Sequence, residues 1–248
     1  MSRANIGHTG TRATRVLGLV TLVGMAALVV WAFAVLPPDV VQGDAARLLP
    51  VHVAVAWLAY LAFGATAVCS ALYLLPRTRS LAWDRVAGAS AEIGVLFLGL
   101  LIGVGMIWGK ITWGVFWRWD PRLTTTALLF LMFVGYLALR GMDAAPAVRA
   151  RRSAVLGIVA ALNIPIVHKS VEWWGSLHQP PSVLRGDGDV TVDGAMLFGL
   201  FLAMIVFTLA YVWLMLHRCR VAMLEAVADE HGLDRALVAR RAEAGVSS

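Results

Sequence analysis

The 248-residue sequence predicts an all-α polytopic membrane protein with six transmembrane helices and both termini in the cytoplasm. Three observations lead to this prediction. The chain is 60% hydrophobic and only 15% charged, and its mean hydropathy is +0.77. Apolar runs near the length that a helix needs to cross a bilayer, about 20 residues, recur along the whole chain. Basic residues gather at alternate ends of these runs, as topology signals do.

Each span must be helical, because lipid offers no partner for an unpaired backbone N–H or C=O group. We place the six spans at residues 16–36, 50–75, 86–108, 123–139, 153–167 and 194–217. The fifth span is short and contains Pro165 near its end. The first has the basic start of a signal peptide, but its apolar stretch exceeds the roughly 7–15 residues of a signal core. We therefore expect it to be retained.

The basic residues of the links divide unevenly between the two sides of the membrane. Fifteen lie in the N-terminus, residues 76–85, residues 140–152 and the C-terminal tail, whereas the other links hold six. The positive-inside rule therefore places both termini in the cytoplasm and the links that follow the third and fifth spans outside. The same distribution explains the net charge of +6 without a nucleic-acid partner.

The expected organisation is a transmembrane domain at residues 1–219 and a cytoplasmic amphipathic tail at 220–248. Within the first, we expect an outer tryptophan-rich loop at 108–122 and a second outer loop at 168–193. Cys69 and Cys219 show no zinc-binding spacing, so we assign them no chemistry. The tail has apolar residues at helical spacing, namely Met223, Val227, Leu233 and Leu237.

Residues 108–120 are unusually rich in aromatic side chains for a link between helices. They include Trp108, Trp113, Trp117 and Trp119, and the second outer loop adds Trp173 and Trp174. Only Trp83 and Trp213 mark the inner side, whereas an interfacial aromatic belt would be more even. We favour a shelf of these six outer indole rings that holds a large planar apolar ligand. An aromatic belt is the alternative interpretation.

Three histidines lie on the same outer side. His52 opens the second span, His168 closes the fifth, and His178 follows ten residues later. Neutral imidazole is a common axial ligand of haem iron. Two histidines from separate segments can clamp a porphyrin whose edge lies on the indole rings. The alternative is that these histidines are hydrogen-bonded residues of the membrane interface.

Charged residues beside the tryptophans have competing interpretations. Asp120 followed by Pro121 predicts the N-cap and first position of the fourth helix. Arg122, with Lys110, Arg118 and Lys169, can pair with haem propionates, although basic residues that face water need no ligand. Glu92 lies inside the third span, where a carboxylate is a functional candidate. Its nearness to a helix N-terminus favours a structural role.

Three stretches of this sequence resemble one family of membrane proteins. WGKITWGVFWRWDPRLT at 108–124 is similar to the tryptophan-rich "WWD" signature of haem-handling proteins in cytochrome c biogenesis. VHKSVEWWGSLHQ at 167–179 and PVHVAVAW at 50–57 resemble one branch, the cytochrome c maturation protein C family (CcmC, haem exporter protein C). The resemblance covers nearly the whole chain, but the acidic, glycine-rich stretch after His178 departs from it.

The resemblance implies a protein of the cytoplasmic (inner) membrane that holds haem b at its outer face. It also implies that the protein is not an enzyme and that it delivers haem to the chaperone CcmE. Its other partners would be the ABC-type subunits CcmA and CcmB and the small CcmD. His52 and His178 would bind the iron, with His168 as the substitute ligand. The remaining haem-binding residues would be Trp108, Trp113, Trp117, Trp119, Asp120, Arg122, Trp173 and Trp174.

Two other functions fit parts of the sequence. A haem-free permease subunit of an ABC exporter would explain the helices but not the tryptophan shelf. A small synthase-like protein that attaches haem to cytochrome c would share the signature, but such proteins need more helices and a larger outer domain. The chain contains no GxxxxGK[ST] phosphate-binding loop, so we expect no ATP hydrolysis by this protein itself.

Overall fold

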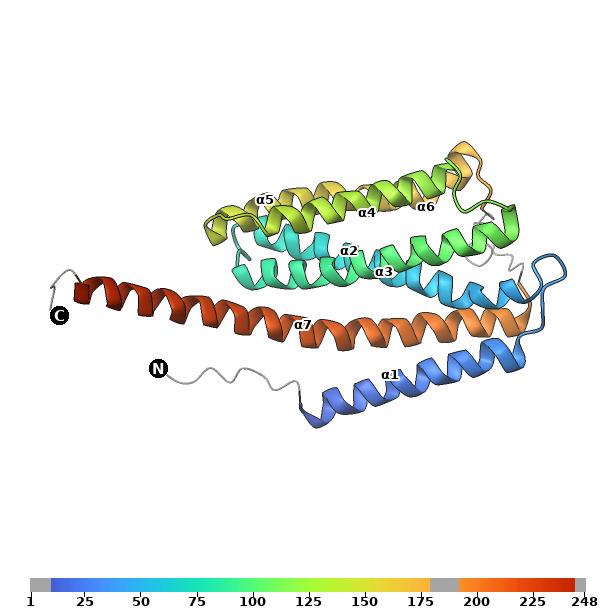
Figure 1. Ribbon diagram of the computed structural model, residues 1–248, viewed down its shortest axis with the longest axis horizontal. Coiled ribbons are helices and arrows are strands. Elements are labelled where there is room, and N and C mark those ends of the chain that lie inside the picture. Colours follow the sequence, from blue (N-terminus) through green and yellow to red (C-terminus); the bar gives the residue numbers. More distant parts are fainter. Residues whose placement is uncertain (1–9, 179–191, 244–248) are drawn as a thin grey trace.

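The computed structural model describes residues 10–178 and 192–243 as a bundle of long helices (Figure 1). The centre of the expected second outer loop and the last residues of the expected tail lie outside this described part. The helices are α1 (Arg12–Val30), η1 (Trp31–Val35, a π-helix), η2 (Asp44–Leu48, a 3₁₀-helix), α2 (Leu49–Leu74), α3 (Leu81–Trp113), α4 (Pro121–Arg140), α5 (Pro146–Ala161), α6 (Asn163–Trp174) and α7 (Gly194–Glu243).

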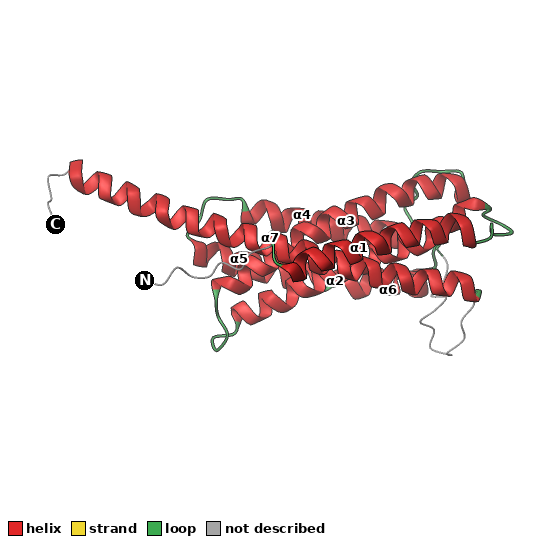
Figure 2. Ribbon diagram, turned by 90° about the horizontal axis from the view of Figure 1, so that it is seen from below, coloured by secondary structure: helices red, strands yellow, loops and turns green. Residues whose placement is uncertain are grey.

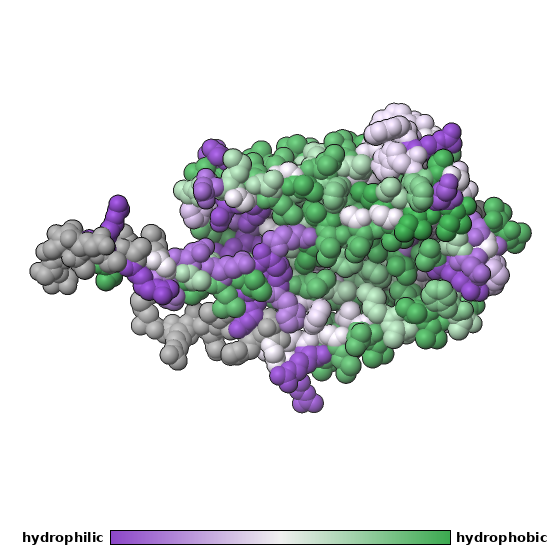
Figure 3. Space-filling model, in the orientation of Figure 1, coloured by the Kyte–Doolittle hydropathy of each residue, from purple (hydrophilic) through white to green (hydrophobic). Residues whose placement is uncertain are grey.

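The expected membrane fold is confirmed. Six helical segments of the described chain are long and apolar enough to cross a membrane: Arg12–Val35, Asp44–Leu74, Leu81–Trp113, Pro121–Arg140, Pro146–Trp174 and Gly194–Gly232. They run along one common direction (Figure 2). The face of the bundle in Figure 3 is apolar over most of its length, and hydrophilic residues gather toward its two ends.

The fifth span is longer than expected and is broken in the middle. Helix α5 ends at Ala161, and α6 begins at Asn163. Pro165 explains the break, because a proline has no N–H to donate and its ring clashes with the carbonyl group four residues earlier, here that of Ala161. The Asn163 side chain donates to the Thr125 carbonyl at 2.9 Å, which ties the start of α6 to α4.

Both outer links are shorter than the sequence suggested. Helix α3 continues to Trp113, where Gly114 ends it in the left-handed conformation with a φ of +74°. Residues 108–113 are therefore helical, and the expectation of a loop from residue 108 was wrong. Helix α6 continues to Trp174, and Gly175, with a φ of +67°, follows it. The expected loop start at 168 was also wrong.

The expected tail is part of the last transmembrane helix. Helix α7 is continuous over 50 residues, from Gly194 to Glu243. It extends beyond the other helices at the end of the bundle where α1 begins (Figure 1). The sequence suggested a separate surface helix after residue 219. Residues 220–243 instead continue α7. A chain that leaves the membrane without Pro or another helix breaker has no local reason to turn at the surface.

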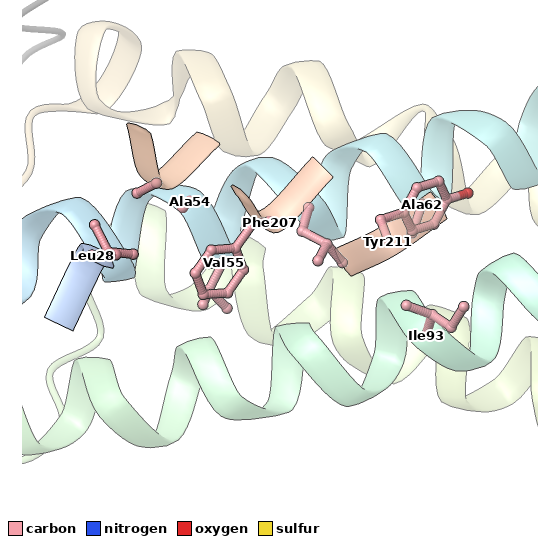
Figure 4. Packing of buried hydrophobic residues seen from close by; sticks show 9 residues of the cluster. Leu28, Ala54, Val55, Ala62, Ile93, Phe207 and Tyr211 are labelled. Carbon is pink, nitrogen blue, oxygen red and sulfur yellow. The ribbon is translucent and has the colours of Figure 1, made fainter. Parts of the chain in front are cut away.

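Helix α2 lies at the centre of the bundle and packs against α3, α5 and α7. One apolar cluster joins α1, α2, α3 and α7 through residues that include Leu28, Val55, Ile93 and Phe207 (Figure 4). A second cluster lies between α2, α3, α4 and the α5–α6 segment. Ser90 of α3 adds polar contacts, since its hydroxyl donates to the Ala62 carbonyl at 2.6 Å and lies 2.7 Å from the Tyr211 hydroxyl.

Among the described residues, two ion pairs join different helices of the bundle. The two terminal guanidinium nitrogens of Arg140, Nη1 and Nη2, contact the buried Asp84 carboxylate. Arg140 lies at the end of α4, and Asp84 lies in the first turn of α3. Glu92 of α3 pairs with Arg218 of α7, with an Oε1···Nη2 distance of 2.9 Å. Helix α3 begins at Leu81, so the expectation that Glu92 lies close to a helix N-terminus was wrong. The Arg218 guanidinium group instead matches this intramembrane carboxylate.

Candidate functional site

The segments singled out by the sequence meet at one end of the bundle, which we call the tryptophan end. Helix α3 ends there, α2 and α4 begin there, and α6 ends there (Figure 1). The link between α1 and α2 lies at the same end. Residues that are distant in the sequence therefore come together at the tryptophan end.

His52 lies in the first turn of α2 and faces α3. Its ring meets Trp108 edge to face, with the centroids 5.3 Å apart and an interplanar angle of 86°. A Cβ atom built on Gly105 would lie 3.3 Å from Cε1 of His52, so the absence of a side chain there lets the imidazole approach α3. Nδ1 of His52 is buried and has no hydrogen-bond partner among the described residues. A buried imidazole nitrogen without a partner is uncommon, and the His52 ring is therefore not held in place by a hydrogen bond through this atom.

His178 reaches the same end from the link after α6. Gly175 ends α6 and turns the chain back toward α3. The His178 ring lies against Trp113, with the centroids 5.0 Å apart and an interplanar angle of 71°. Its backbone N–H donates to the Ser176 hydroxyl at 3.0 Å. Each candidate iron ligand therefore packs against one tryptophan of the last turns of α3.

Asp120 connects the two links. Oδ1 accepts the backbone N–H groups of Arg122 and Leu123 at 2.9 and 3.3 Å, which confirms the expected N-cap of α4. The carboxylate also binds the other link, because Oδ2 accepts the Leu177 N–H at 2.8 Å and lies 2.7 Å from the Ser176 hydroxyl. The cap was expected from the sequence, whereas this bridge to the second link was not.

The electrostatics of this group favour an ionised aspartate beside a neutral histidine. Burial alone would raise the pKa of Asp120, but hydrogen bonds from the Leu177 N–H and Ser176 bring it below its usual value. Oδ1 of Asp120 lies 3.4 Å from Nδ1 of His178. Burial lowers the pKa of His178 below 6.5, with the nearby Arg122 acting in the same direction and Asp120 opposing it. The imidazole is therefore neutral at pH 7, as metal ligation requires.

Arg122 lies among these groups. One of its terminal nitrogens donates to the His168 carbonyl at 2.9 Å, whereas its buried Nε has no partner among the described residues. His168 itself contributes its backbone there, and its side chain is exposed.

The six tryptophans do not form one continuous shelf. Trp108 and Trp113 are half-buried on α3 with the histidines. Trp117 and Trp119 pack against each other, with ring centroids 5.8 Å apart, and Trp119 is 82% exposed. Trp173 and Trp174 form another exposed pair at the end of α6, with centroids 5.6 Å apart. The structure therefore separates the two tryptophans beside the histidines from two other pairs, in which Trp117 is half-buried and Trp119, Trp173 and Trp174 are exposed.

Of the basic residues that the sequence grouped with Arg122, both Lys110 and Lys169 have local roles. Lys110 donates to the Gly114 carbonyl at 2.8 Å and so helps to end α3. Lys169 donates to both carboxylate oxygens of Glu172, at 3.0 and 2.9 Å. Arg118 instead lines an open hollow of about 440 Å³ between the two links. The hollow is lined by Arg118, Trp119, Asp120, Pro121, Gly175, Ser176 and Leu177.

Two residues of this site were missed in the sequence. Gln42, in the link between η1 and η2, accepts the indole N–H of Trp108 at 3.2 Å. Ser176 joins Asp120 to His178, as described above. Ser176 stood inside the motif, but its partner lies 56 positions away, so no local pattern identified it. For Gln42, only the turn signal of Asp39 and Gly43 was visible.

The chain is similar to known proteins over most of its length. A family model described as heme exporter protein C matches residues 3–233. Heme exporter protein C of Bradyrhizobium diazoefficiens is 42% identical over 188 residues, which are 75% of this chain and 70% of that protein. Heme exporter protein C of Haemophilus influenzae is 34% identical over 205 residues, covering 83% of this chain and 82% of the relative.

A plant mitochondrial protein shares part of the sequence as well. The putative cytochrome c biosynthesis ccmC-like mitochondrial protein of Arabidopsis thaliana is 36% identical over 154 residues, covering 62% of this chain and 57% of that protein. The family match spans all six helical segments, and it includes the residues of the tryptophan end described above. The chain belongs to the heme exporter protein C family.

Proposed function

We propose that this protein binds haem b at the tryptophan end and delivers it to the haem chaperone CcmE in cytochrome c maturation. The central support is the placement of two half-buried imidazoles, His52 and His178, each against an indole ring of α3. The two imidazoles come from two separate elements, so they can approach haem iron from opposite faces. Haem iron with two imidazole ligands suits this donor set, because neutral imidazole binds haem iron and the His178 ring is neutral at pH 7.

Membrane topology supports the same proposal. By the positive-inside rule, the fifteen-to-six distribution of basic residues would put both termini in the cytoplasm and the tryptophan end outside. In a bacterium, this end would face the periplasm from the cytoplasmic membrane. The exposed side chains of Trp119, Trp173 and Trp174 would then lie at the outer surface, where a soluble chaperone has access to them.

The residues of the site divide the work of holding haem. His52 and His178 would bind the iron. Trp108 and Trp113 beside the two imidazoles, together with Trp117 and Trp119 in the link that follows, would give the porphyrin flat apolar contacts. Arg122 has a free buried Nε and can bind a propionate through its planar guanidinium group. Asp120 would orient His178 through Ser176 and its own carboxylate, as acidic groups commonly do for ligating histidines.

The partners belong to the same proposal. We propose that the protein works beside the ABC-type subunits CcmA and CcmB and the small CcmD, and that CcmE takes the haem. The protein would be a carrier rather than an enzyme, because the proposed site holds haem through reversible iron–nitrogen, ion-pair and stacking contacts. His168 would substitute as ligand only if one of the two proposed ligands were lost.

The test is a transfer experiment with purified components. The protein is isolated with its haem, mixed with haem-free CcmE, and covalent haem on CcmE is measured by a stain after denaturation. We expect a Soret band in the isolated protein and haem on CcmE after mixing. If the isolated protein shows no Soret band, it would instead be a haem-free permease subunit. Attachment of haem directly to apocytochrome c, without CcmE, would indicate a synthase.

A variant pair separates binding from delivery. In Trp117→Ala/Trp119→Ala, about 1–3 kcal/mol of stacking per ring is removed, so haem content should fall well below that of either single variant. Trp83→Ala, on the inner side, is the control and should leave haem content unchanged. Normal haem content with no transfer to CcmE would show that this tryptophan pair docks the chaperone and does not hold haem.

A further inference from the structure

The link between η1 and η2 forms a small hairpin at the tryptophan end. The backbones of Asp39 and Gly43 exchange two hydrogen bonds, with N···O distances of 3.0 and 2.9 Å. Gly43 has a φ of +55°, which a residue without a Cβ atom adopts without strain. The Asp39 carboxylate accepts the N–H groups of Val41 and Gln42, both at 2.8 Å. These bonds define the conformation of the turn and the direction in which the Gln42 side chain leaves it.

Gln42 uses this position to hold Trp108. The indole N–H of Trp108 donates to Oε1 of Gln42 at 3.2 Å, across 66 positions of sequence. Because the indole nitrogen only donates, Gln42 must present its carbonyl oxygen. Trp108 is half-buried, so its N–H group has limited access to water. A buried donor still needs an acceptor, and Gln42 supplies it. The hairpin therefore sets the orientation of one indole ring on α3.

Trp108 in turn determines the environment of His52. The two rings meet at 86° with centroids 5.3 Å apart. No hydrogen bond orients the imidazole through Nδ1, because this buried atom has no partner among the described residues. The ring orientation thus depends on packing, and Trp108 supplies the aromatic part of that packing. Most ligating histidines are oriented by a hydrogen bond to their second nitrogen, and His52 lacks one in this structure.

We propose that Gln42 is a positioning residue for the iron ligand His52 and that it acts through the indole N–H of Trp108. The inference rests on the proposed haem-binding function. It extends the site to the hairpin between η1 and η2, which none of the sequence motifs includes. It also gives the two axial ligands different supports, Asp120 and Ser176 for His178 and the Gln42–Trp108 pair for His52.

The test compares Gln42→Met and Gln42→Glu in the full-length protein purified from membranes. Methionine has a similar length but is only a weak acceptor, whereas glutamate keeps a strong acceptor at the same distance. We expect Gln42→Met to weaken haem retention by about two- to tenfold, the range for one hydrogen bond, and to shift the electron paramagnetic resonance g-values of the ferric low-spin haem. Gln42→Glu should behave like the wild type.

A double-variant cycle asks whether Gln42 acts through Trp108. Trp108→Phe keeps an aromatic ring beside His52 but removes the N–H group. In that background, Gln42→Met should have no further effect on haem retention or on the g-values. Additive effects would overturn the proposal, because they would mean that Gln42 acts by another route. Val40→Ala, at a fully exposed position of the same hairpin, is the matched control and should match the wild type.

Other outcomes also decide the question. If Gln42→Met does not accumulate in membranes, Gln42→Asn replaces it; this amide is one methylene shorter and should show the same shift if reach to Trp108 matters. A wild-type spectrum in both variants would overturn the positioning role. If Val40→Ala has the same effect as Gln42→Met, the hairpin contacts haem directly and Gln42 has no special role. Absence of haem from the wild-type protein would instead refute the proposed function itself.

Discussion

Asp120 has two roles in one carboxylate. It caps α4, and it also binds the Ser176 hydroxyl and the Leu177 N–H of the second outer link. Four donors surround its two oxygens, and His178 lies 3.4 Å from one of them. An asparagine would cap the helix about as well, but its amide group would turn one acceptor into a donor. If the cap that the sequence predicts were the only role of Asp120, asparagine would be tolerated at this position.

The structure reverses that expectation for Asp120→Asn. The change should leave α4 intact but leave one donor of the Ser176–Leu177 link without its acceptor, at a cost of about 1–3 kcal/mol. We expect haem content to fall and the spectrum of the His178-ligated iron to change, at normal protein abundance. Thr124→Ala, on the exposed side of the same first turn, is the control. Normal haem content in Asp120→Asn would restore capping as the only role.

Arg122 should not tolerate replacement if it binds a propionate. Arg122→Gln removes the charge, and Arg122→Lys removes the planar two-point contact, while both are good helix formers. We expect reduced haem retention in both variants, by about 1.5–3 kcal/mol for the loss of charged hydrogen bonds in Arg122→Gln. Lys169→Gln, whose cation pairs with Glu172, serves as the comparison. Equal effects of the Arg122 and Lys169 variants would argue for a general charge effect instead.

The environment of His178 makes a prediction about pH. Burial keeps its pKa below 6.5, so the folded site prefers the neutral ring and the unfolded chain takes up a proton first as the pH falls. The folded link therefore keeps its full stability above pH 6.5. It loses stability progressively as the pH falls below 6.5, because the unfolded chain then binds a proton that the folded site does not. The low-spin haem spectrum should therefore stay constant from about pH 8 to 6.5 and decline only at lower pH. A midpoint above pH 7 in a spectroscopic titration would contradict this.

Among the elements, α3 is the one whose position determines the site. It carries Trp108 and Trp113 at one end, and Asp84 pairs with Arg140 at the other. Gly88 leaves room for this ion pair, since a Cβ atom there would lie 2.8 Å from the Arg140 guanidinium group. Farther along α3, Gly94 lets the Phe63 ring lie directly on the helix backbone. The Phe63 ring is stacked on that of Phe133, with the ring centroids 3.7 Å apart.

Two glycines of α3 offer a matched test of this packing. A methyl group at Gly94 would lie 2.5 Å from Cε1 of Phe63, which is fully buried and cannot move away. Gly94→Ala should therefore destabilise the protein by about 1–3 kcal/mol through overpacking. At Gly103, no atom lies within 4 Å of the added methyl group, so Gly103→Ala should be neutral or stabilising by up to about 1 kcal/mol. Thermal unfolding in detergent measures both, and equal midpoints would refute the packing argument.

The sequence predicted some element boundaries better than others. The start of α4 was predictable, because Asp120 and Pro121 form a local capping signal. The ends of α3 and α6 were not, because we limited each span to the thickness of a bilayer. The residues after Trp108 are compatible with a helix, and Gly109 is buried in the helix rather than ending it. The first residue that requires another conformation is Gly114, with its positive φ.

At the scale of the whole molecule, hydropathy was enough to predict six spans, because lipid allows a chain few alternatives to helices. The assembly of the tryptophan end was less accessible. His52, Trp108, Asp120 and His178 were all identified from their residue types, but the contacts between them join positions far apart in the chain. Gln42 was missed for the same reason, since only the packing of the hairpin against α3 brings it to Trp108.

The central claim is that His52 and His178 bind one haem between them, and absorption spectroscopy of the purified protein tests it most directly. We expect His52→Ala and His178→Ala each to shift or abolish the Soret and α/β bands, and added imidazole to restore them in part. His168→Ala, whose exposed side chain stands apart from both rings in our assignment, should keep the wild-type spectrum. Unchanged spectra in both single variants, with loss in His168→Ala, would contradict the account and move the ligand to His168.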